Sequence, residues 1–275
     1  MLGSAAFCGV LPLHEALATE DIQGISVGTA LAGHTGNLPL GRPFAAYFEA
    51  HIEQGPILEQ AGLPIGVVTG GQAICWLDVL VTGSPAHAGT TPMRLRRDAL
   101  FAASAMINRL EQLADEFQPH GLVTVGQLAI PGSSRNTIPG QVGFTIDLRH
   151  HQDTQIAAME QRTRAVLQEL AGQRGMAIDI QQHWFSAATP FDPDCIAAVQ
   201  QAVTALGYPH QQIVSGAGHD AIHLARHCPT TMIFIPCVGG LSHHEAEDAL
   251  PDDVRMGADV LLGAVLQQAG GRPQD

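Results

Sequence analysis

The chain contains no lysine, and all 13 of its basic residues are arginine. The absence of lysine excludes Schiff-base catalysis and the lysine of a phosphate-binding P-loop. Basic residues are outnumbered by 26 acidic ones, which argues against nucleic acid as a partner. No apolar run reaches the roughly 20 residues that a membrane-spanning helix needs, so we expect no membrane partner.

Cysteine is also scarce, with five residues scattered along the chain and no CxxC pair. This usage is typical of reduced, mostly buried thiols in a cytoplasmic protein. The first residues, MLGSAAFCGVLPL, lack the basic region of a signal peptide. We therefore expect a cytoplasmic protein.

The 275 residues, 45% of them hydrophobic, suffice for one large or two ordinary domains. The middle of the chain has the periodicities of alternating strands and helices. We expect a strand, a helix, two strands, a helix and a strand at 75–83, 96–117, 122–130, 141–149, 153 to about 170, and 177–185. This order is typical of a ferredoxin-like split βαβ domain of about 110 residues.

The segments on either side have a different pattern. We expect strands at 64–70 and 230–237, helices at 14–22, 190–207 and 254–270, and a glycine-rich turn that opens a helix in 215–228. The predicted fold class is therefore α/β, with an α/β region that is split in sequence around an inserted ferredoxin-like α+β domain. The predicted boundaries are 1–73, 74–186 and 187–275.

The segment YFEAHIEQG, 47–55, places His51 between two carboxylates and ends in glycine. It looks too short and too mixed in composition to be an ordinary strand. On spacing alone, His51 is one histidine among 14 and could be a surface or core residue. Because imidazole is also a good ligand for Zn²⁺ or Mn²⁺, a metal site is the alternative.

Several specific motifs occur in a fixed order along nearly the whole chain. They are HIEQGPILE (51–59), IGVVTG (65–70), GSPAHAGTTPMRLRRDAL (83–100), RNTIPG and DLR (135–149), SGAGHDA (215–221) and GLSHHEAE (240–247). Together they resemble the hydantoinase/carbamoylase amidases, dinuclear metallohydrolases of the M20-like group that hydrolyse N-carbamoyl amino acids, β-ureido acids and allantoate. The resemblance implies an aminopeptidase-like catalytic domain, an inserted lid that forms a homodimer, and two divalent metal ions, Zn or Mn.

The same resemblance implies the metal ligands. It makes His51 a ligand of one metal and His243 a ligand of the other. Adjacent histidines in extended backbone point to opposite faces, so only one of His243 and His244 can face the site, and the family motif GxSH selects His243. Glu247 matches a family carboxylate with a structural role.

The substrate-binding residues are also implied by the resemblance. His87 would reach across the dimer and polarise the scissile carbonyl. Asn136 and Arg149 would hold the carboxylate of a small-molecule substrate, since a guanidinium binds a carboxylate through two parallel hydrogen bonds. We expect the hairpin that joins them to bring them together; the alternative for Arg149 is a surface ion pair.

Three further residues line the site by resemblance. Gln54 matches a position near the substrate, and the backbone N–H of Gly218 could meet an anion. His219 lies in the same turn. His223 and His227 follow at intervals of four residues, a spacing that could bind zinc on one helical face. The resemblance does not account for those two, and we interpret them as packing or surface residues.

Two further observations concern the metal ligands of the family: one segment imitates a ligand motif, and other ligand motifs are absent. His151 and Asp153 imitate the HxD metal motif of the family, but Asp153 is better used as a helix N-cap. The family takes its HxD histidine, bridging aspartate and Glu-Glu pair from a segment upstream of MLGSAAFCG, and no Glu-Glu dipeptide occurs here. We therefore expect an N-terminally truncated family member whose chain alone binds no stable metal pair, and whose sheet has an exposed edge.

Three functional hypotheses follow. The first is an amidohydrolase of linear carbamoyl or ureido C–N bonds. The second is a non-catalytic dimerisation or small-acid-binding protein, which a natural loss of the upstream ligands would produce. The third is a related metallopeptidase, which HIEQGP and AHAGTTPM fit less well.

Overall fold

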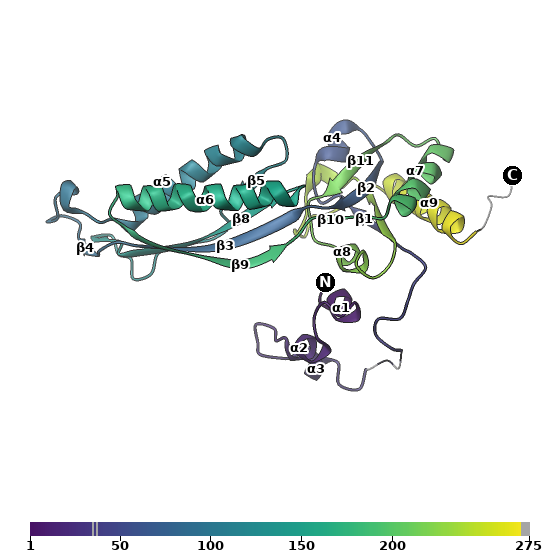
Figure 1. Ribbon diagram of the computed structural model, residues 1–275, viewed down its shortest axis with the longest axis horizontal. Helices are drawn as coiled ribbons and strands as arrows, with labels where there is room; N and C mark the ends of the chain where they lie inside the picture. Colours follow the sequence, from purple (N-terminus) through teal and green to yellow (C-terminus); the bar gives the residue numbers. More distant parts are fainter. Residues whose placement is uncertain (35, 37, 271–275) are drawn as a thin grey trace. The chain divides into compact units, whose positions relative to one another are not determined.

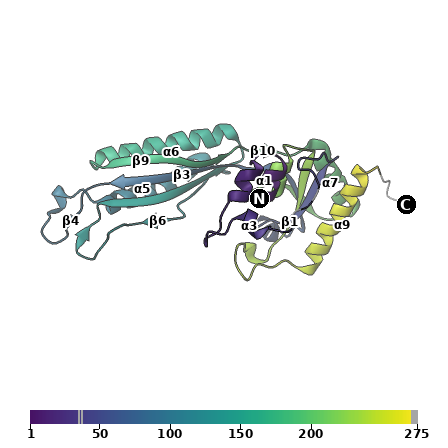
Figure 2. The ribbon, with the colours of Figure 1, turned by 90° about the horizontal axis from the view of Figure 1, so that it is seen from below.

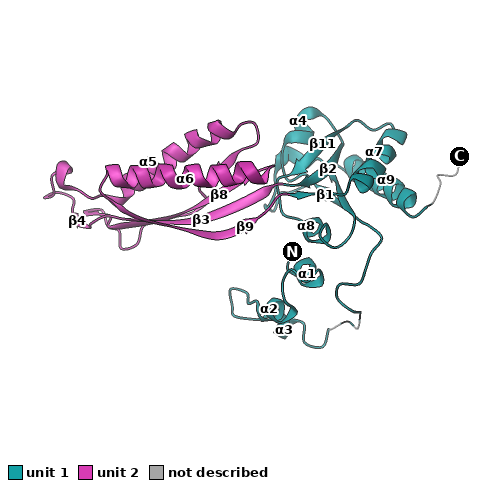
Figure 3. Ribbon diagram, viewed as in Figure 1, with its two compact units in different colours: residues 1–71, 189–275 teal, residues 72–188 magenta. Residues whose placement is uncertain are grey.

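The computed structural model describes residues 1–34, 36 and 38–270. The chain divides into two compact units, coloured separately in Figure 3: unit 1 is Met1–Gly71 with Thr189–Asp275, and unit 2 is Gln72–Ala188. Within the described residues, no helix is both long and apolar enough to cross a membrane.

Unit 2 is an antiparallel sheet with two long helices along one face (Figure 1). The strand order is β5-β8-β3-β9, and β6 also pairs with β8. Its elements are β3 (Ala73–Thr82), β4 (Ala86–His87), η1 (Met93–Leu95), α5 (Ala99–Ala114), η2 (Asp115–Phe117), β5 (Leu122–Thr124), β6 (Leu128–Ala129), β7 (Thr137–Ile138), β8 (Gln141–His150), α6 (Asp153–Gln173) and β9 (Ala177–Ser186). The order of strands and helices agrees with that expected from the sequence.

Alternation along β3 explains the two faces of this sheet. Leu77 and Val79 are buried and belong to the apolar core beneath α5 and α6, whereas Trp76, Asp78 and Leu80 between and beside them are exposed. The core therefore lies on one face, and the opposite face of the sheet is open.

Two local expectations in unit 2 were wrong. Asp153 does not cap α6: the N-cap is Gln152, and Asp153 is the first helical residue, whose carboxylate accepts the Ala188 N–H at 2.7 Å. The strand expected at 122–130 is interrupted between β5 and β6, where Gln127 N–H donates to the hydroxyl of Thr145 at 3.1 Å and the Gln127 carbonyl accepts the Thr145 N–H at 3.2 Å.

Unit 1 contains a mixed sheet between helices. Its strand order is β1-β12-β2-β10, and β11 also pairs with β2. Its elements are α1 (Leu2–Phe7), α2 (Leu13–Ala18), α3 (Val27–Ala30), β1 (Tyr47–Ile52), α4 (Ile57–Ala61), β2 (Ile65–Gly71), β10 (Thr189–Pro190), α7 (Pro193–Ala205), β11 (His210–Ser215), α8 (Asp220–Leu224), β12 (Thr230–Ile235), η3 (Val238–Gly240) and α9 (Pro251–Gln268). Helices α7 and α9 lie side by side against one face (Figures 1 and 2), and α8 packs on the other.

The segment 47–55 does contain a strand, contrary to expectation. Strand β1 runs parallel to β12, from Tyr47 opposite Thr230 to Ile52 opposite Ile235. Main-chain hydrogen bonds to β12 hold this segment as a strand despite its mixed composition. A mixture of polar and apolar residues fits a strand whose two sides face different environments. Within the described residues β1 pairs with β12 alone, so it is an edge strand of this sheet.

In 215–228 a glycine-rich turn opens a helix, as expected, but this helix, α8, is short. It spans Asp220–Leu224, with His219 at its N-cap. His227 lies beyond its end, where Nε2 contacts the Arg42 carbonyl at 2.9 Å and the ring packs edge-on against Phe7. The three histidines at intervals of four therefore do not share one helical face.

Candidate functional site

The polar face of β1 carries a glutamate that the sequence analysis did not single out. Glu49 Oε2 accepts hydrogen bonds from the Tyr47 hydroxyl at 3.1 Å and from the Ala221 N–H at 2.9 Å. Burial raises the pKa of Glu49, although both hydrogen bonds act in the opposite direction. The signal that could have found it is the period-two alternation of Tyr47, Glu49 and His51, which places all three on one face once 47–52 is recognised as a strand.

Two imidazoles meet on this face. The rings of His51 and His219 lie 4.6 Å apart, edge to face. His219 is only 3% exposed, and burial, followed by the charge of His51, lowers its pKa to about 4, so it is neutral at pH 7. Its Nδ1 lies 3.8 Å from Glu49 Oε1, too far for a hydrogen bond, and its buried Nε2 has no partner within the described residues. A buried, unpaired nitrogen of this kind is expected where a ligand binds.

His51 has a defined tautomer. Its Nδ1 lies 2.8 Å from the Ile52 carbonyl oxygen, which can only accept, so Nδ1 carries the proton. The lone pair of the neutral ring is therefore on Nε2. This is the arrangement that orients metal-ligating histidines.

A hydrogen bond joins two segments that are far apart in sequence. Gln54 Nε2 donates to Ser242 Oγ at 2.9 Å, linking HIEQG to GLSHHE. The non-glycine residues with left-handed backbone in the described part of the chain are Gln54, with φ of 60°, and His243, with φ of 58°. Such conformations cost roughly 1 kcal/mol or more each and cluster at functional sites.

Glu247 organises the loop that carries His243. Its Oε2 accepts the His243 N–H at 3.0 Å. The Ser242 hydroxyl, this N–H and the nearby His243 and His51 side chains together lower the pKa of the Glu247 carboxyl. His51 and His243, the two candidate ligands, therefore both contribute to the lowered pKa of Glu247.

Two neighbouring residues have structural roles. Glu53 is buried, and its carboxylate accepts the N–H groups of Ile57 and Leu58 at 2.9 and 2.7 Å, which fixes the start of α4. Gly218 lies under the side chain of Met1, and a Cβ at this position would approach the Met1 Cε to 2.6 Å. The turn before α8 thus has no room for a larger residue while Met1 occupies this position.

The metal-ligating side chains that come together in the described residues are too few for a complete metal site. Among residues 1–34, 36 and 38–270, no three histidine, cysteine, aspartate or glutamate side chains come together in a geometry that could hold a metal ion. Protein zinc sites use three or four such ligands. His51 and His243 do not make one by themselves.

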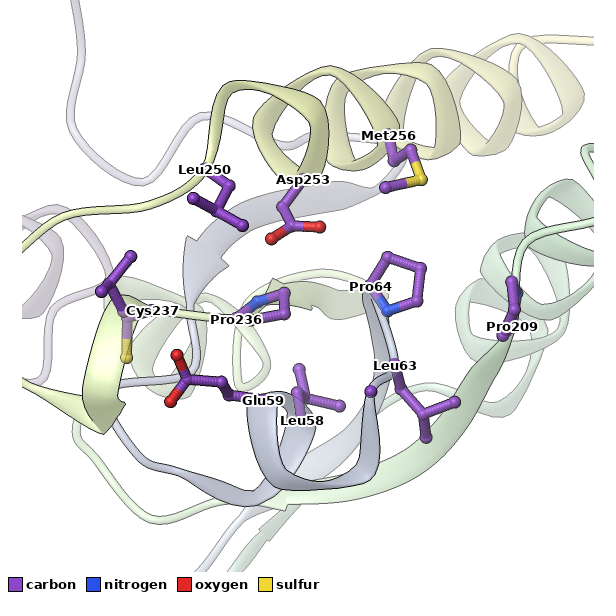
Figure 4. A pocket seen from close by; sticks show the side chains of 12 residues that line it. Leu58, Glu59, Leu63, Pro64, Pro209, Pro236, Cys237, Leu250, Asp253 and Met256 are labelled. Atoms are coloured by element: carbon purple, nitrogen blue, oxygen red, sulfur yellow. The ribbon is translucent and has the colours of Figure 1, made fainter.

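A separate hollow in unit 1, of about 370 Å³, contains none of the predicted site residues (Figure 4). Its lining is mainly apolar, with Leu58, Pro64 and Pro236 among the wall residues. The carboxylate of Glu59 at its rim accepts the Gly239 N–H at 2.9 Å. This hollow is therefore separate from the candidate site.

In unit 2, His87 and Asn136 are neighbours. His87 lies on β4 opposite Thr137 of β7, and Ala88 N–H donates to the Asn136 carbonyl at 2.9 Å. His87 Nδ1 accepts the N–H groups of Gly89 and Thr90 at 3.1 and 3.2 Å. Its neutral form therefore carries the proton on Nε2, and this N–H is available to donate to a carbonyl.

Arg149 lies at the other end of β8, so the expectation that the hairpin brings it to Asn136 was wrong. Arg149 is eight residues beyond Gln141, which at ~3.3 Å per residue is about 26 Å along the strand. Its guanidinium donates to Asp147, from Nε at 2.9 Å and from Nη2 at 2.6 Å. Asn136 precedes the start of β8 and Arg149 lies near its end, so the length of this strand separates the two residues.

The sequence profile of peptidase family M20/M25/M40 matches residues 3–267. The chain belongs to this family. Within M20 it belongs to the hydantoinase/carbamoylase amidases: the N-carbamoyl-L-amino-acid amidohydrolase of Rhizobium meliloti is 43% identical over 98% of this chain. The N-carbamoyl-L-amino acid amidohydrolase of Geobacillus stearothermophilus is 37% identical over 98% of it. This chain spans 65% and 68% of the length of these two relatives.

Solved structures share the mixed α/β fold of this M20 chain over part of their length. A hydantoinase/carbamoylase family amidase from Burkholderia ambifaria superimposes with a TM-score of 0.91 and 55% identity, covering 99% of this chain and 66% of that one. AtUAH in complex with glyoxylate gives a TM-score of 0.82 and 31% identity, covering 98% and 67%. The ligand of AtUAH is a small carboxylate.

Proposed function

We propose that this M20 chain serves the hydrolysis of linear carbamoyl or ureido C–N bonds, with N-carbamoyl amino acids or allantoate as the substrate class. The observation that carries the proposal is the junction of 51–54 with 242–247 through the Gln54–Ser242 hydrogen bond. It ties the segment that carries His51 to the segment that carries His243 and Glu247, nearly 190 positions further along the chain. The names and reactions of the relatives support the same reaction class.

The proposed cofactors are two divalent metal ions, Zn or Mn. Bound metals of this kind polarise a carbonyl and lower the pKa of water. His51, through Nε2, and His243 would each ligate one of them, and His219 with Glu49 would line the same face. The described residues do not supply enough ligands for such a site, so the proposal requires further ligands from outside the described residues.

We further propose that unit 2 is a ferredoxin-like lid that forms a homodimer. Asn136 precedes the start of β8, and Arg149 lies about 26 Å along that strand from its first residue, Gln141. One small carboxylate cannot contact both ends within one chain. If Asn136 and Arg149 hold the same carboxylate, one must come from each protomer, and the Nε2–H of His87 would then approach the scissile carbonyl beside the partner's Arg149.

A mixing experiment tests this arrangement through binding of N-carbamoyl-L-alanine, measured by calorimetry. Asn136→Ala and Arg149→Gln should each abolish binding, and Arg135→Gln, beside Asn136 and exposed, should not. After exchange of subunits between the two defective variants, half of the dimers are mixed and each has one intact site, so about one quarter of the sites should recover. No recovery would place the clamp within one protomer and contradict the proposal.

Metal and turnover measurements separate the alternatives. Two tightly bound metal ions per chain together with hydrolysis of an N-carbamoyl amino acid would show that the chain's own donors suffice. Faster hydrolysis of dipeptides would favour a metallopeptidase. Binding of the acid without turnover in Zn²⁺ or Mn²⁺ would favour a non-catalytic small-acid-binding protein, which the short donor set also fits.

A further inference from the structure

The two tryptophans of the chain lie side by side on the open face of the unit 2 sheet. Trp76 of β3 and Trp184 of β9 are cross-strand partners with ring centroids 4.9 Å apart. They are 39% and 40% exposed, respectively. Both long helices pack on the opposite face (Figure 1). A pair of large aromatic side chains held at a surface is typical of a binding site.

A β-bulge in β9 assembles this surface. Trp76 is opposite Trp184, but the next residue, Leu77, is opposite Gln182, so His183 is the extra residue. Consecutive residues of a regular strand point to opposite faces, whereas the bulge brings His183 beside Trp184 on the open side. The His183 ring stacks 6.3 Å from that of Trp76 at 27°, and its Nδ1 lies 3.2 Å from Asp78 Oδ2.

A groove of about 510 Å³ runs beside the aromatic pair. Its polar lining comes from Thr145, Asp78, Gln127 and Asp147, and Trp76 forms its apolar wall. The volume is within the range of small-molecule sites. A flat aromatic wall next to hydroxyl and carboxylate acceptors fits a planar aryl group that carries an O–H or N–H donor.

Arg149 is adjacent to this groove. Asp147 is the cross-strand partner of Trp76, and Arg149 follows two residues later on the same face. Diagonal cross-strand neighbours such as Arg149 and Trp76 are roughly 7–8 Å apart. Asp147 lines the groove and accepts hydrogen bonds from the Arg149 guanidinium, so it orients that cation toward the same surface.

We propose that the groove is a side-chain subsite for aromatic N-carbamoyl α-amino acids: Arg149 binds the carboxylate, and the aryl ring stacks on Trp76. This inference rests on the proposed function, because it takes Arg149 as the carboxylate clamp. Arg149 and Trp76 are diagonal cross-strand neighbours on one face, so one amino acid would span from the guanidinium to the indole ring. A phenol or indole donor would then face the acceptors on Asp78 and Thr145, which line the groove. A second copy of this face is a poorer occupant, because it would bury Asp78 against its own equivalent.

The test compares N-carbamoyl-L-tyrosine with N-carbamoyl-L-alanine on the full chain by calorimetry. The tyrosine compound should bind roughly tenfold more tightly, as expected for an added aromatic contact. It should also change the intrinsic tryptophan fluorescence, since Trp76 lines the groove and Trp184 is its cross-strand partner. Trp76→Leu should reduce the affinity ratio to about one, leaving the alanine compound unaffected.

Leu80→Ala is the matched control. Leu80 lies on the same strand and face as Trp76, has a comparable exposed fraction of 40%, and is outside the groove. This variant should keep both the affinity ratio and the fluorescence response. Thermal unfolding of both variants verifies that each is folded.

Different failures overturn different claims. Equal affinity for the two compounds, or a preference that survives Trp76→Leu, would overturn the aromatic subsite while leaving the proposed function intact. Undiminished binding of both compounds to Arg149→Gln would overturn the carboxylate clamp of the proposed function and this inference with it. Conversion of a dimer to a monomer by Trp76→Leu, with an unchanged affinity ratio, would show that the tryptophans form a dimer contact instead.

Discussion

The two units use their sheets in opposite ways. In unit 2, alternate residues of β3 enter one continuous apolar core, and the charged residues remain on the open face. In unit 1, the face of β1 beside α8 carries Tyr47, Glu49 and His51, and it contains the buried, unpaired Nε2 of His219. Unit 2 therefore buries mainly apolar groups, although the buried hydroxyl of Thr163 has no partner within the described residues, whereas the site of unit 1 is built from polar groups that need further partners.

The largest effect should come from the core of unit 2. Leu77 is fully buried, so Leu77→Ala should lower the free energy of unfolding by about 3 kcal/mol through lost burial and a cavity. Leu80→Ala, on the open face of the same strand, should cost no more than ~0.5 kcal/mol. Urea unfolding followed by tryptophan fluorescence reports on unit 2, which contains both tryptophans. A similar cost for both variants would contradict the assignment of an open face.

The next effect should come from unit 1. Glu53→Ala leaves the N–H groups of Ile57 and Leu58 without their acceptors, which should cost about 2 kcal/mol. Glu53→Gln keeps one acceptor oxygen and should cost less. Circular dichroism should show that unit 1 unfolds at a lower urea concentration. The urea midpoint of unit 2, followed by tryptophan fluorescence, should not change. A shift of both transitions together would show that the two units unfold as one.

A smaller effect should appear as the pH is lowered. Burial and the charge of nearby His120 lower the pKa values of His150 and His151 in the folded protein. Between those lowered values and the ordinary value of about 6.5, the unfolded chain binds more protons than the folded chain. Unit 2 should therefore lose stability as pH falls from about 7 toward 5.

Removing the charge of His120 should weaken this acid sensitivity. The urea midpoint of His120→Asn, followed by tryptophan fluorescence, should fall less between these pH values than that of the unmodified chain. His14→Asn, which alters an exposed histidine of unit 1, is the control and should change nothing. An unchanged slope for His120→Asn would rule out the imidazole cluster as the cause.

The smallest effect should be confined to the loop that carries His243. Ser242→Ala removes the acceptor of Gln54 Nε2 and a hydrogen bond to Glu247, at a local cost of about 1 kcal/mol. Hydrogen exchange should show faster opening of 238–248 with unchanged global stability. Exchange that is unaffected in this loop would mean that the Gln54–Ser242 bond does not hold it.

Long periodic segments were predictable, whereas short and polar ones were not. The helix at 99–114 and the strand at 141–150 follow from repeated apolar spacing, which many residues support together. The turn and the start of helix α8 in 215–228 were expected, but its end at Leu224, five residues before the last residue ahead of β12, was not marked by any periodic pattern. The strand β1 was missed because it depends on a partner strand about 180 positions away.

The candidate site shows the same division. Motif resemblance alone selected His51, Gln54 and His243, since each lies in a distinctive local sequence. Glu49 was missed, because its role depends on the Ala221 N–H supplied by a distant turn. The pairing of Asn136 with Arg149 was wrong, because sequence proximity does not reveal which end of a long strand a residue occupies.

The sequence by itself determined the family, the order of the long elements of unit 2 and the residue types available for chemistry, because these are properties of local pattern and composition. Only the tertiary structure decided the tautomer of His51, the burial of His219, the separation of Arg149 from Asn136 and the bulge that gathers Trp76 with His183. Each of these depends on backbone conformation and on which group or ring lies within a few ångströms. That proximity is set by the packing of strands and helices and cannot be read from neighbouring residues in the chain.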